Sequence, residues 1–148
     1  MKRFLLLLSL LTLSACQPSD PDLTIITQEG KKYGFEVEMA MTEPQWQKGM
    51  MFRDSLDKHR GMFFWFGGEE EERGFWMKNV KIDLDILFID ADGKIISIAE
   101  GKAGDPTTLP SNGPAVAAFE INGGYSKKWG IKPGDTVHFA YLGNALVE

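Results

Sequence analysis

The sequence predicts a mainly β domain, either an antiparallel β-sandwich or a partly open barrel of about eight strands with one or two short helices. Short runs of β-branched and aromatic residues recur along the chain, separated by turns rich in Gly, Pro, Asn and Asp. Some of these runs alternate apolar with polar residues, which is typical of strands that bury one face. Helical signals are confined to two short stretches, so the strands dominate the prediction.

The N-terminal segment is typical of a secretory signal and is excluded from the fold. Met1-Lys-Arg3 is basic, and an apolar run covers Phe4 to Leu13. This run is about half of the ~20 residues that span a bilayer, so a retained transmembrane helix is not expected. Leu-Ser-Ala-Cys16 resembles the bacterial lipoprotein cleavage box. We therefore expect a removed signal peptide (1–15), a lipid-anchored tether (16–22) and a single β domain (23–148).

Cys16 is the only cysteine in the chain, so no internal disulfide can form, and acylation of this residue explains its presence. Several acyl chains would anchor the protein stably to a membrane. By resemblance to other lipoproteins, Gln17 after the cysteine implies the periplasmic face of the outer membrane if the host has two membranes. We therefore expect an exported protein, lipid-anchored in the cell envelope.

The charge balance of the mature chain argues against nucleic-acid binding. Removing Lys2 and Arg3 from the 16 basic residues leaves 14, against 21 acidic residues, a formal charge of −7. An acidic domain repels phosphate backbones and anionic headgroups. Membrane contact is therefore expected through the lipid and not through a basic patch.

The first half of the domain combines strands with one helix. The stretch 33–41 alternates apolar with polar residues and predicts a half-buried strand of an antiparallel sheet. Thr42 is a good N-cap and Gly49 a suitable C-terminal residue for a short helix between them. The glutamate run 69–72 predicts a solvated loop tip. Two further strands are expected at 23–27 and 61–66.

The stretch 73–93 organises the domain. It predicts strands at 74–79 and 85–89, the second of them apolar on both faces and therefore central. The residues between these strands are too few for a crossover helix, so the strands should be antiparallel or joined by a corner. Asp90-Ala-Asp-Gly93 predicts a hairpin turn, with the returning strand at 94–99.

The remainder of the chain is punctuated by turns. Residues 101–114 hold three prolines, too many for the interior of a sheet, and this long connection is a candidate binding loop. A strand is expected at 115–121, a short helix or turn at 124–130, and a last strand at 136–141.

Five residues are candidates for a binding site: Arg53, Trp76, Lys78, Asn79 and Asp85. Their polar groups lie beside aromatic residues, as in a polar-rimmed pocket for a small ligand, a glycan or an envelope protein. A binding module without catalysis is the first hypothesis.

Two alternatives remain open. Asp85 or Glu120 could act as a general acid or base in a hydrolase for an envelope saccharide or ester. Asp85 could instead hold a corner through hydrogen bonds from backbone amides or from Arg53, making the motif purely structural. No cofactor or metal is expected, because no phosphate-binding glycine motif precedes a helix and the only histidines, His59 and His138, are far apart.

Several motifs in order resemble the DUF192 family, a bacterial and archaeal family without an established activity. They are Thr42-Glu-Pro with Lys-Gly-Met-Met-Phe-Arg53, Arg60-Gly-Met with Phe64, Phe75-Trp-Met-Lys-Asn79, Leu84-Asp-Ile-Leu-Phe-Ile-Asp90 and Gly130-Ile-Lys-Pro-Gly-Asp135. The chain departs from the family pattern at Val80 and Asp83 and lacks cysteines in 101–114. The resemblance implies an all-β fold with small helical additions.

Overall fold

The computed structural model describes residues 20–139. Cys16, the predicted signal segment and the end of the last predicted strand, 140–141, lie outside this range. The described residues form nine strands and two short helices: β1 (Leu23–Ile26), β2 (Lys32–Ala40), α1 (Glu43–Lys48), β3 (Arg60–Trp65), β4 (Glu71–Phe75), β5 (Leu84–Ile89), β6 (Ile95–Gly101), β7 (Leu109–Ala115), β8 (Ala117–Asn122), α2 (Tyr125–Trp129) and β9 (Thr136–Phe139).

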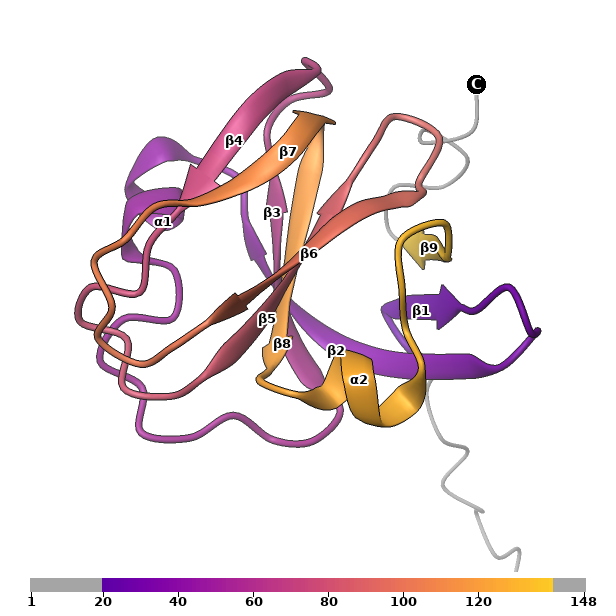
Figure 1. Ribbon diagram of the computed structural model, residues 1–148, viewed down its shortest axis with the longest axis horizontal. Helices are drawn as coiled ribbons and strands as arrows, with labels where there is room; N and C mark the ends of the chain where they lie inside the picture. The colour runs from indigo at the N-terminus through magenta and orange to yellow at the C-terminus, as the bar shows by residue number, and fades with distance from the viewer. Residues whose placement is uncertain (1–19, 140–148) are drawn as a thin grey trace, which may run out of the picture.

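Seven strands form one curled sheet in the order β6-β5-β8-β3-β2-β1-β9 (Figure 1). The strand pairs are antiparallel except β2 and β3, which run parallel. The sequence predicted an antiparallel setting for the strand at 33–41, and this is correct only for its pairing with β1. The parallel pair is possible because α1 and the loop after it give the chain enough length to cross over.

The two ends of the curled sheet approach each other. Lys94 and Thr136 form an isolated antiparallel bridge. Beside it, Ile95 N–H donates to the Asp135 carbonyl at 2.8 Å and Val137 N–H to the Gly93 carbonyl at 2.7 Å. Of the two predicted architectures, the structure therefore confirms the partly open barrel, because pairing of this kind removes part of the free edge of the sheet.

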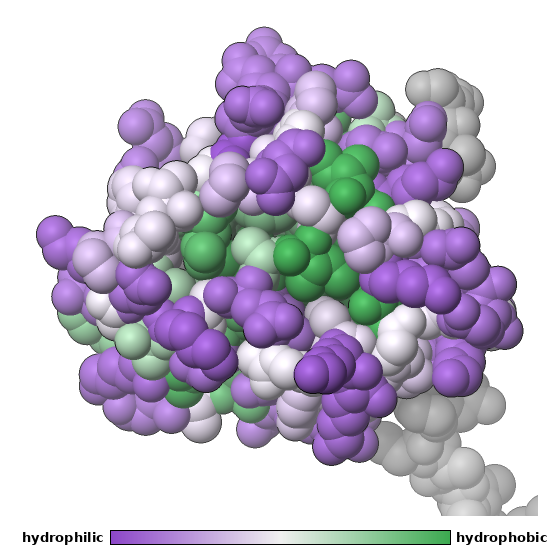
Figure 2. Space-filling view, in the orientation of Figure 1, coloured by the Kyte–Doolittle hydropathy of each residue, from purple (hydrophilic) through white to green (hydrophobic). Residues whose placement is uncertain are grey.

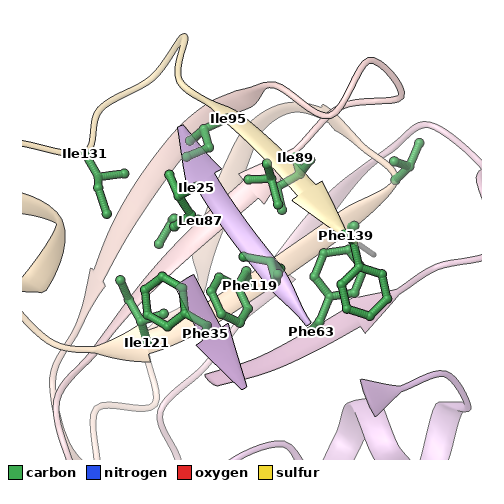
Figure 3. Packing of buried hydrophobic residues seen from close by; sticks show 14 residues of the cluster. Ile25, Phe35, Phe63, Leu87, Ile89, Ile95, Phe119, Ile121, Ile131 and Phe139 are labelled. Carbon is green, nitrogen blue, oxygen red and sulfur yellow. The ribbon is translucent and has the colours of Figure 1, made fainter. Parts of the chain in front are cut away.

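Strand β5 is buried along its whole length, which confirms that it is central. Leu87 and Ile89 belong to a hydrophobic cluster on one face of the sheet, which also holds Phe35, Phe63 and Phe119 (Figure 3). We call this the first cluster. On the other face, a second cluster contains these buried residues: Ala40, Met50, Met62, Phe64, Met77, Val80, Leu84, Ile86, Phe88, Ala115 and Ala118.

The two-stranded sheet of β4 and β7 departs most from the sequence predictions. The expected strand at 74–79 instead begins at Glu71, inside the predicted loop tip, and ends at Phe75. β7 occupies much of the predicted binding loop at 101–114. Pro110 and Pro114 are tolerated because β7 lies in this small sheet and not in the interior of the large one.

The chain turns sharply between β4 and β5, which lie in different sheets. Of the two predicted arrangements, antiparallel pairing or a corner, the structure has the corner. The predicted hairpin turn at Asp90–Gly93 is confirmed: Asp90 Oδ1 accepts the N–H groups of Asp92 and Lys94, and Gly93 has a φ of +74°. Figure 2 shows apolar side chains in the middle of the face over β6, surrounded by hydrophilic ones.

The predicted helix between Thr42 and Gly49 is present as α1, and of the helix or turn predicted at 124–130 the structure has the helix, α2. Thr42 is the N-cap of α1, as predicted, and its N–H donates to Gln45 Oε1 at 3.0 Å. Gly49 ends the helix with a φ of +44°. Between residues 20 and 139, neither helix is long and apolar enough to cross a membrane.

Candidate functional site

The candidate site begins with a row of side chains across the large sheet. Glu38 on β2 is paired in register with Met62 on β3, which is opposite Glu120 on β8, which is opposite Ile86 on β5. Residues directly opposite each other project to the same face of a sheet. Glu38 and Glu120 therefore project to the face of the second cluster.

Glu120 is a buried carboxyl group on β8 between the apolar residues Phe119 and Ile121. Only 4% of the residue is exposed. Within the described part of the chain, its Oε2 atom has no hydrogen-bond partner. Burial raises the pKa of Glu120 to about 8, and the nearby positive charge of Arg53 only partly opposes this effect. The carboxyl group is therefore protonated at neutral pH.

The nearest positive charge is already engaged. Arg53, in the loop between α1 and β3, binds Glu38 through both terminal nitrogens, with Nη1–Oε1 and Nη2–Oε2 distances of 2.6 Å. This bidentate pair holds the pKa of Glu38 below its usual value and raises that of Arg53. Because the guanidinium group is held by Glu38, it influences Glu120 by charge and not by a direct bond.

A cavity of about 310 Å³ lies over Glu120. Its walls come from α1 and the residues after it, from β3 and from β4. Five aromatic residues line it: Trp46, Phe64, Phe66, Phe75 and Trp76. This volume is at the lower end of the range of about 300–1,000 Å³ for small-molecule sites. The cavity is thus an aromatic pocket with one buried polar group.

Neighbouring contacts fix the orientation of the aromatic walls. Trp46 donates its indole N–H to the Ala40 carbonyl at 2.9 Å and lies edge-on to Phe66, with ring centroids 5.4 Å apart. The Arg73 guanidinium group lies 4.5 Å from the centroid of the Phe66 ring. Phe75 makes edge contacts with Phe64 at 5.0 Å. Such contacts stabilise each ring in one position, so the pocket is preformed.

Trp76, which lines the cavity, and Phe52, which follows the lining residue Met51, are exposed aromatic residues. Trp76 is 43% exposed and Phe52 is 62% exposed. Phe52 and Asn79 both have positive φ values, 66° and 61°, and Phe52 N–H donates to the Asn79 carbonyl at 2.9 Å. Asparagine tolerates this conformation, but for phenylalanine it is strained, and strain of this kind gathers at functional sites.

The structure brings only part of the predicted site together. Trp76 lines the cavity, and Arg53 lies close enough to Glu120 to affect its pKa. Lys78 and Asn79 are exposed residues of the turn after β4. The sequence does not identify Trp46, Phe66 and Phe75 as pocket walls, because its motifs give no sign of which aromatic residues meet in the fold.

Asp85 lies apart from the cavity. Its side chain projects to the face of the first cluster, and its two oxygens accept the N–H groups of Gly124 and Ser126 at 2.8 Å each. These bonds fix the loop that leads into α2. In residues 20–139, no group of three or more acidic, histidine or cysteine side chains is placed to hold a metal ion.

Comparisons with known proteins agree with this fold. A crystal structure from Sinorhizobium meliloti 1021, provisionally described as a transcription regulator, has 34% sequence identity and a TM-score of 0.77. The matched region covers 80% of this chain and 92% of the Sinorhizobium chain. A protein of unknown function from Novosphingobium aromaticivorans DSM 12444 has 39% identity and a TM-score of 0.75, covering 79% of this chain and 83% of its own.

No curated protein of known function matches the chain. The family model of DUF192, described as an uncharacterised ACR, matches residues 24–139. Apart from Leu23, the first residue of β1, this range includes every strand described above and all residues of the cavity. The chain therefore belongs to the DUF192 family.

Proposed function

We propose that this domain is a non-catalytic binding module that holds one small ligand in the cavity over Glu120. One observation carries the proposal: Glu120 lines the cavity, and its buried Oε2 atom has no hydrogen-bond partner within residues 20–139. A buried polar atom without a hydrogen bond costs about 1–3 kcal/mol. A ligand that donates a hydrogen bond to this oxygen would recover that free energy on binding.

The shape and chemistry of the cavity support a ligand of modest size. Aromatic and methionine side chains give it apolar walls, and a single buried polar group can fix the orientation of the ligand. The exposed ring of Trp76, which lines the cavity, could contact the remainder of a larger molecule. A small ligand fits the enclosed part best, and a glycan or a segment of an envelope protein would have to place one group inside.

The setting that we propose for this binding module is the cell envelope, with the domain anchored through an acylated Cys16. Support comes from the basic, apolar and small-residue segments of residues 1–16. We predict that radiolabelled palmitate enters the wild-type protein in cells and that Cys16→Ser abolishes both this labelling and recovery in the membrane fraction. Unchanged membrane recovery of the variant would contradict lipid anchoring.

The binding proposal is tested with the chain as cells process it. A library of small polar compounds is screened by thermal shift, and hits are titrated by the intrinsic fluorescence of the protein, to which Trp46 and Trp76 contribute. We expect hits that raise the melting temperature of the wild type and lose most of this effect in Glu120→Gln and in Trp76→Ala. Asp54→Asn, a change at an exposed residue, is the matched control and should retain binding.

One observation favours a second function. A carboxyl group with a pKa of about 8 is protonated at neutral pH and can act as a general acid. Asp85 lies on the other face of the sheet, so this alternative rests on Glu120 alone. A hydrolase of this kind would show a rate that falls above about pH 8 and is lost in Glu120→Gln. If no turnover appears on a broad panel of saccharides and esters while ligands bind, the binding module is the better description.

A further inference from the structure

We infer that the group bound at Glu120 is an organic cation, such as an alkylammonium, enclosed by the aromatic walls of the cavity. This inference rests on the proposed binding function and adds the chemical class of the ligand. Three features of the cavity lead to it: the unpartnered oxygen of the lining carboxyl group, the aromatic rings of the lining and the balance of the surrounding charges.

The unpartnered oxygen requires a donor from outside the described chain. Arg53 is the cation whose charge acts on Glu120, but both of its terminal nitrogens are held by Glu38 at 2.6 Å. Oε2 of Glu120 is buried and has no bond within residues 20–139. A charged N–H donor forms a shorter and stronger bond to a carboxylate than a neutral donor does. An ammonium group is therefore the donor that should form the strongest hydrogen bond with this oxygen.

The walls of the cavity suit a cation more than a neutral polar group. The face of an aromatic ring attracts a cation by about 0.5–2 kcal/mol, most strongly for tryptophan and more where water is excluded. One wall already shows this preference, because the Arg73 guanidinium group lies over the Phe66 ring at 4.5 Å. The rings of Trp46 and Trp76, with those of Phe64 and Phe75, complete the lining.

The charged groups around the cavity otherwise balance. Arg53 is paired with Glu38, and Arg73 lies 3.2 Å from Glu71. On the lining itself, Lys48 of α1 and Glu72 of β4 have opposite signs and are both exposed.

Glu120 is thus the lining carboxyl group whose ionisation is left without a compensating partner. The chain as a whole is also acidic, which draws cations toward it. An anion would meet the carboxylate once Glu120 ionises, and a neutral donor would leave the ring faces unused.

Binding of a cation is expected to release a proton. In the free protein the raised pKa keeps Glu120 protonated at neutral pH. The cation favours the ionised carboxylate, so its affinity should rise about tenfold per pH unit below about pH 8 and level off above it. A neutral ligand that accepts a hydrogen bond from the protonated carboxyl group should instead bind more weakly above about pH 8.

The experiment compares n-butylammonium, n-butanol and butyrate, which share a carbon chain and differ in the charge of the head group. Each is titrated into the processed chain, and the change in tryptophan indole NMR signals gives the dissociation constant at about pH 6, 7 and 8.5. Calorimetry in two buffers with different ionisation enthalpies counts the protons released. We expect the ammonium to bind at least about tenfold more tightly than the alcohol, with close to one proton released near pH 7.

Two variants make the result specific. Glu120→Gln keeps the shape of the side chain and should remove both the preference for the cation and the release of a proton. Asp54→Asn changes an exposed carboxylate that is not among the residues lining the cavity and should retain both. Thermal unfolding of each variant confirms that it is folded.

The outcomes separate the two proposals. If butanol or butyrate binds as tightly as butylammonium, or if the preference survives in Glu120→Gln, the cavity binds ligands but the inference of a cation is wrong. If all three probes fail to bind at concentrations up to about 0.1 M, where even affinities far weaker than millimolar would be seen, the inference is also overturned. If the compound library fails as well, the binding function falls with it.

Discussion

Two buried carboxyl groups on neighbouring strands differ in their hydrogen-bond partners. Asp85 on β5 and Glu120 on β8 are 2% and 4% exposed. Asp85 is opposite Ile121, the residue after Glu120, and Ile86, the residue after Asp85, is opposite Glu120. The two carboxyl groups are therefore only one position apart in the register of the two strands. They project to opposite faces of the sheet. Asp85 accepts two backbone N–H groups, whereas Oε2 of Glu120 has no partner in the described residues.

The difference shows that burial alone does not mark a functional carboxylate. Asp135 is a third example: it is fully buried and accepts the N–H groups of Gln28 and Lys132 at 2.9 and 2.8 Å. Asp85 and Asp135 each fix loops by hydrogen bonds to backbone N–H groups, which is a structural role. Glu120 has no such role and is the group that remains available to a ligand.

The largest effect is expected from removing the structural carboxylate. In Asp85→Ala, the N–H groups of Gly124 and Ser126 lose their acceptor in a buried position. Leaving buried donors unpaired should lower the free energy of unfolding by about 3–5 kcal/mol, as measured by urea denaturation.

Asp54→Ala is the control for this change, because Asp54 is an exposed aspartate whose side chain is 83% accessible and binds only Lys81 among the described contacts. It should cost less than about 1 kcal/mol. A loss of similar size in both variants would mean that Asp85 does not hold the loop before α2.

A smaller effect of opposite sign is expected at Glu120. Its folded pKa of about 8 exceeds the ordinary value of 4.5, so the unfolded chain loses this proton first as pH rises. Stability conferred by the neutral carboxyl group is complete below about pH 4.5 and is lost as pH rises toward 8, with a slope of about 1.4 kcal/mol per pH unit. Glutamine does not titrate, so Glu120→Gln lacks this loss.

The measurement compares urea unfolding of the wild type and Glu120→Gln at about pH 5.5 and 7.5. Between pH 5.5 and 7.5, the free energy of unfolding of the variant should rise by about 2–3 kcal/mol relative to that of the wild type. Contributions that the two proteins share cancel in this difference. A constant difference would show that Glu120 is ionised in the folded protein at both pH values and that a partner compensates its charge.

The sequence predicts the strands and helices that carry Asp85 and Glu120 better than it predicts the different hydrogen bonding of these two residues. The apolar run around Ile86 and Phe88 has no polar face, so a central strand was the only arrangement that buries it. Thr42 and Gly49 likewise mark the ends of α1 correctly. In contrast, β7 was hidden by its prolines, because local rules for strands assume a sheet interior that this strand does not occupy.

The chemistry of the site depends on contacts that local patterns do not encode. Glu120 within the apolar strand at 115–121 indicates a carboxyl group on or near the core. Whether such a group is partnered depends on Arg53, which is distant in sequence and binds Glu38 instead. Asp85 was named both as a binding residue and as a residue that holds a corner, and its hydrogen bonds to backbone amides match the second reading.

The smallest effect concerns the link between Arg53 and Glu120. Arg53→Gln removes a charge that lowers the pKa of Glu120, so this pKa should move further upward, while the contacts of Asp85 are unchanged. The Arg53–Glu38 pair is partly exposed and screened by water, so the free energy of unfolding should fall by only about 1 kcal/mol or less. The carboxyl ¹³C signal of Glu120, followed by NMR across the pH range, measures the shift directly. A downward shift would mean that the freed Glu38 and the rearranged loop admit water to the cavity, and that Arg53 protects Glu120 by covering it and not by its charge.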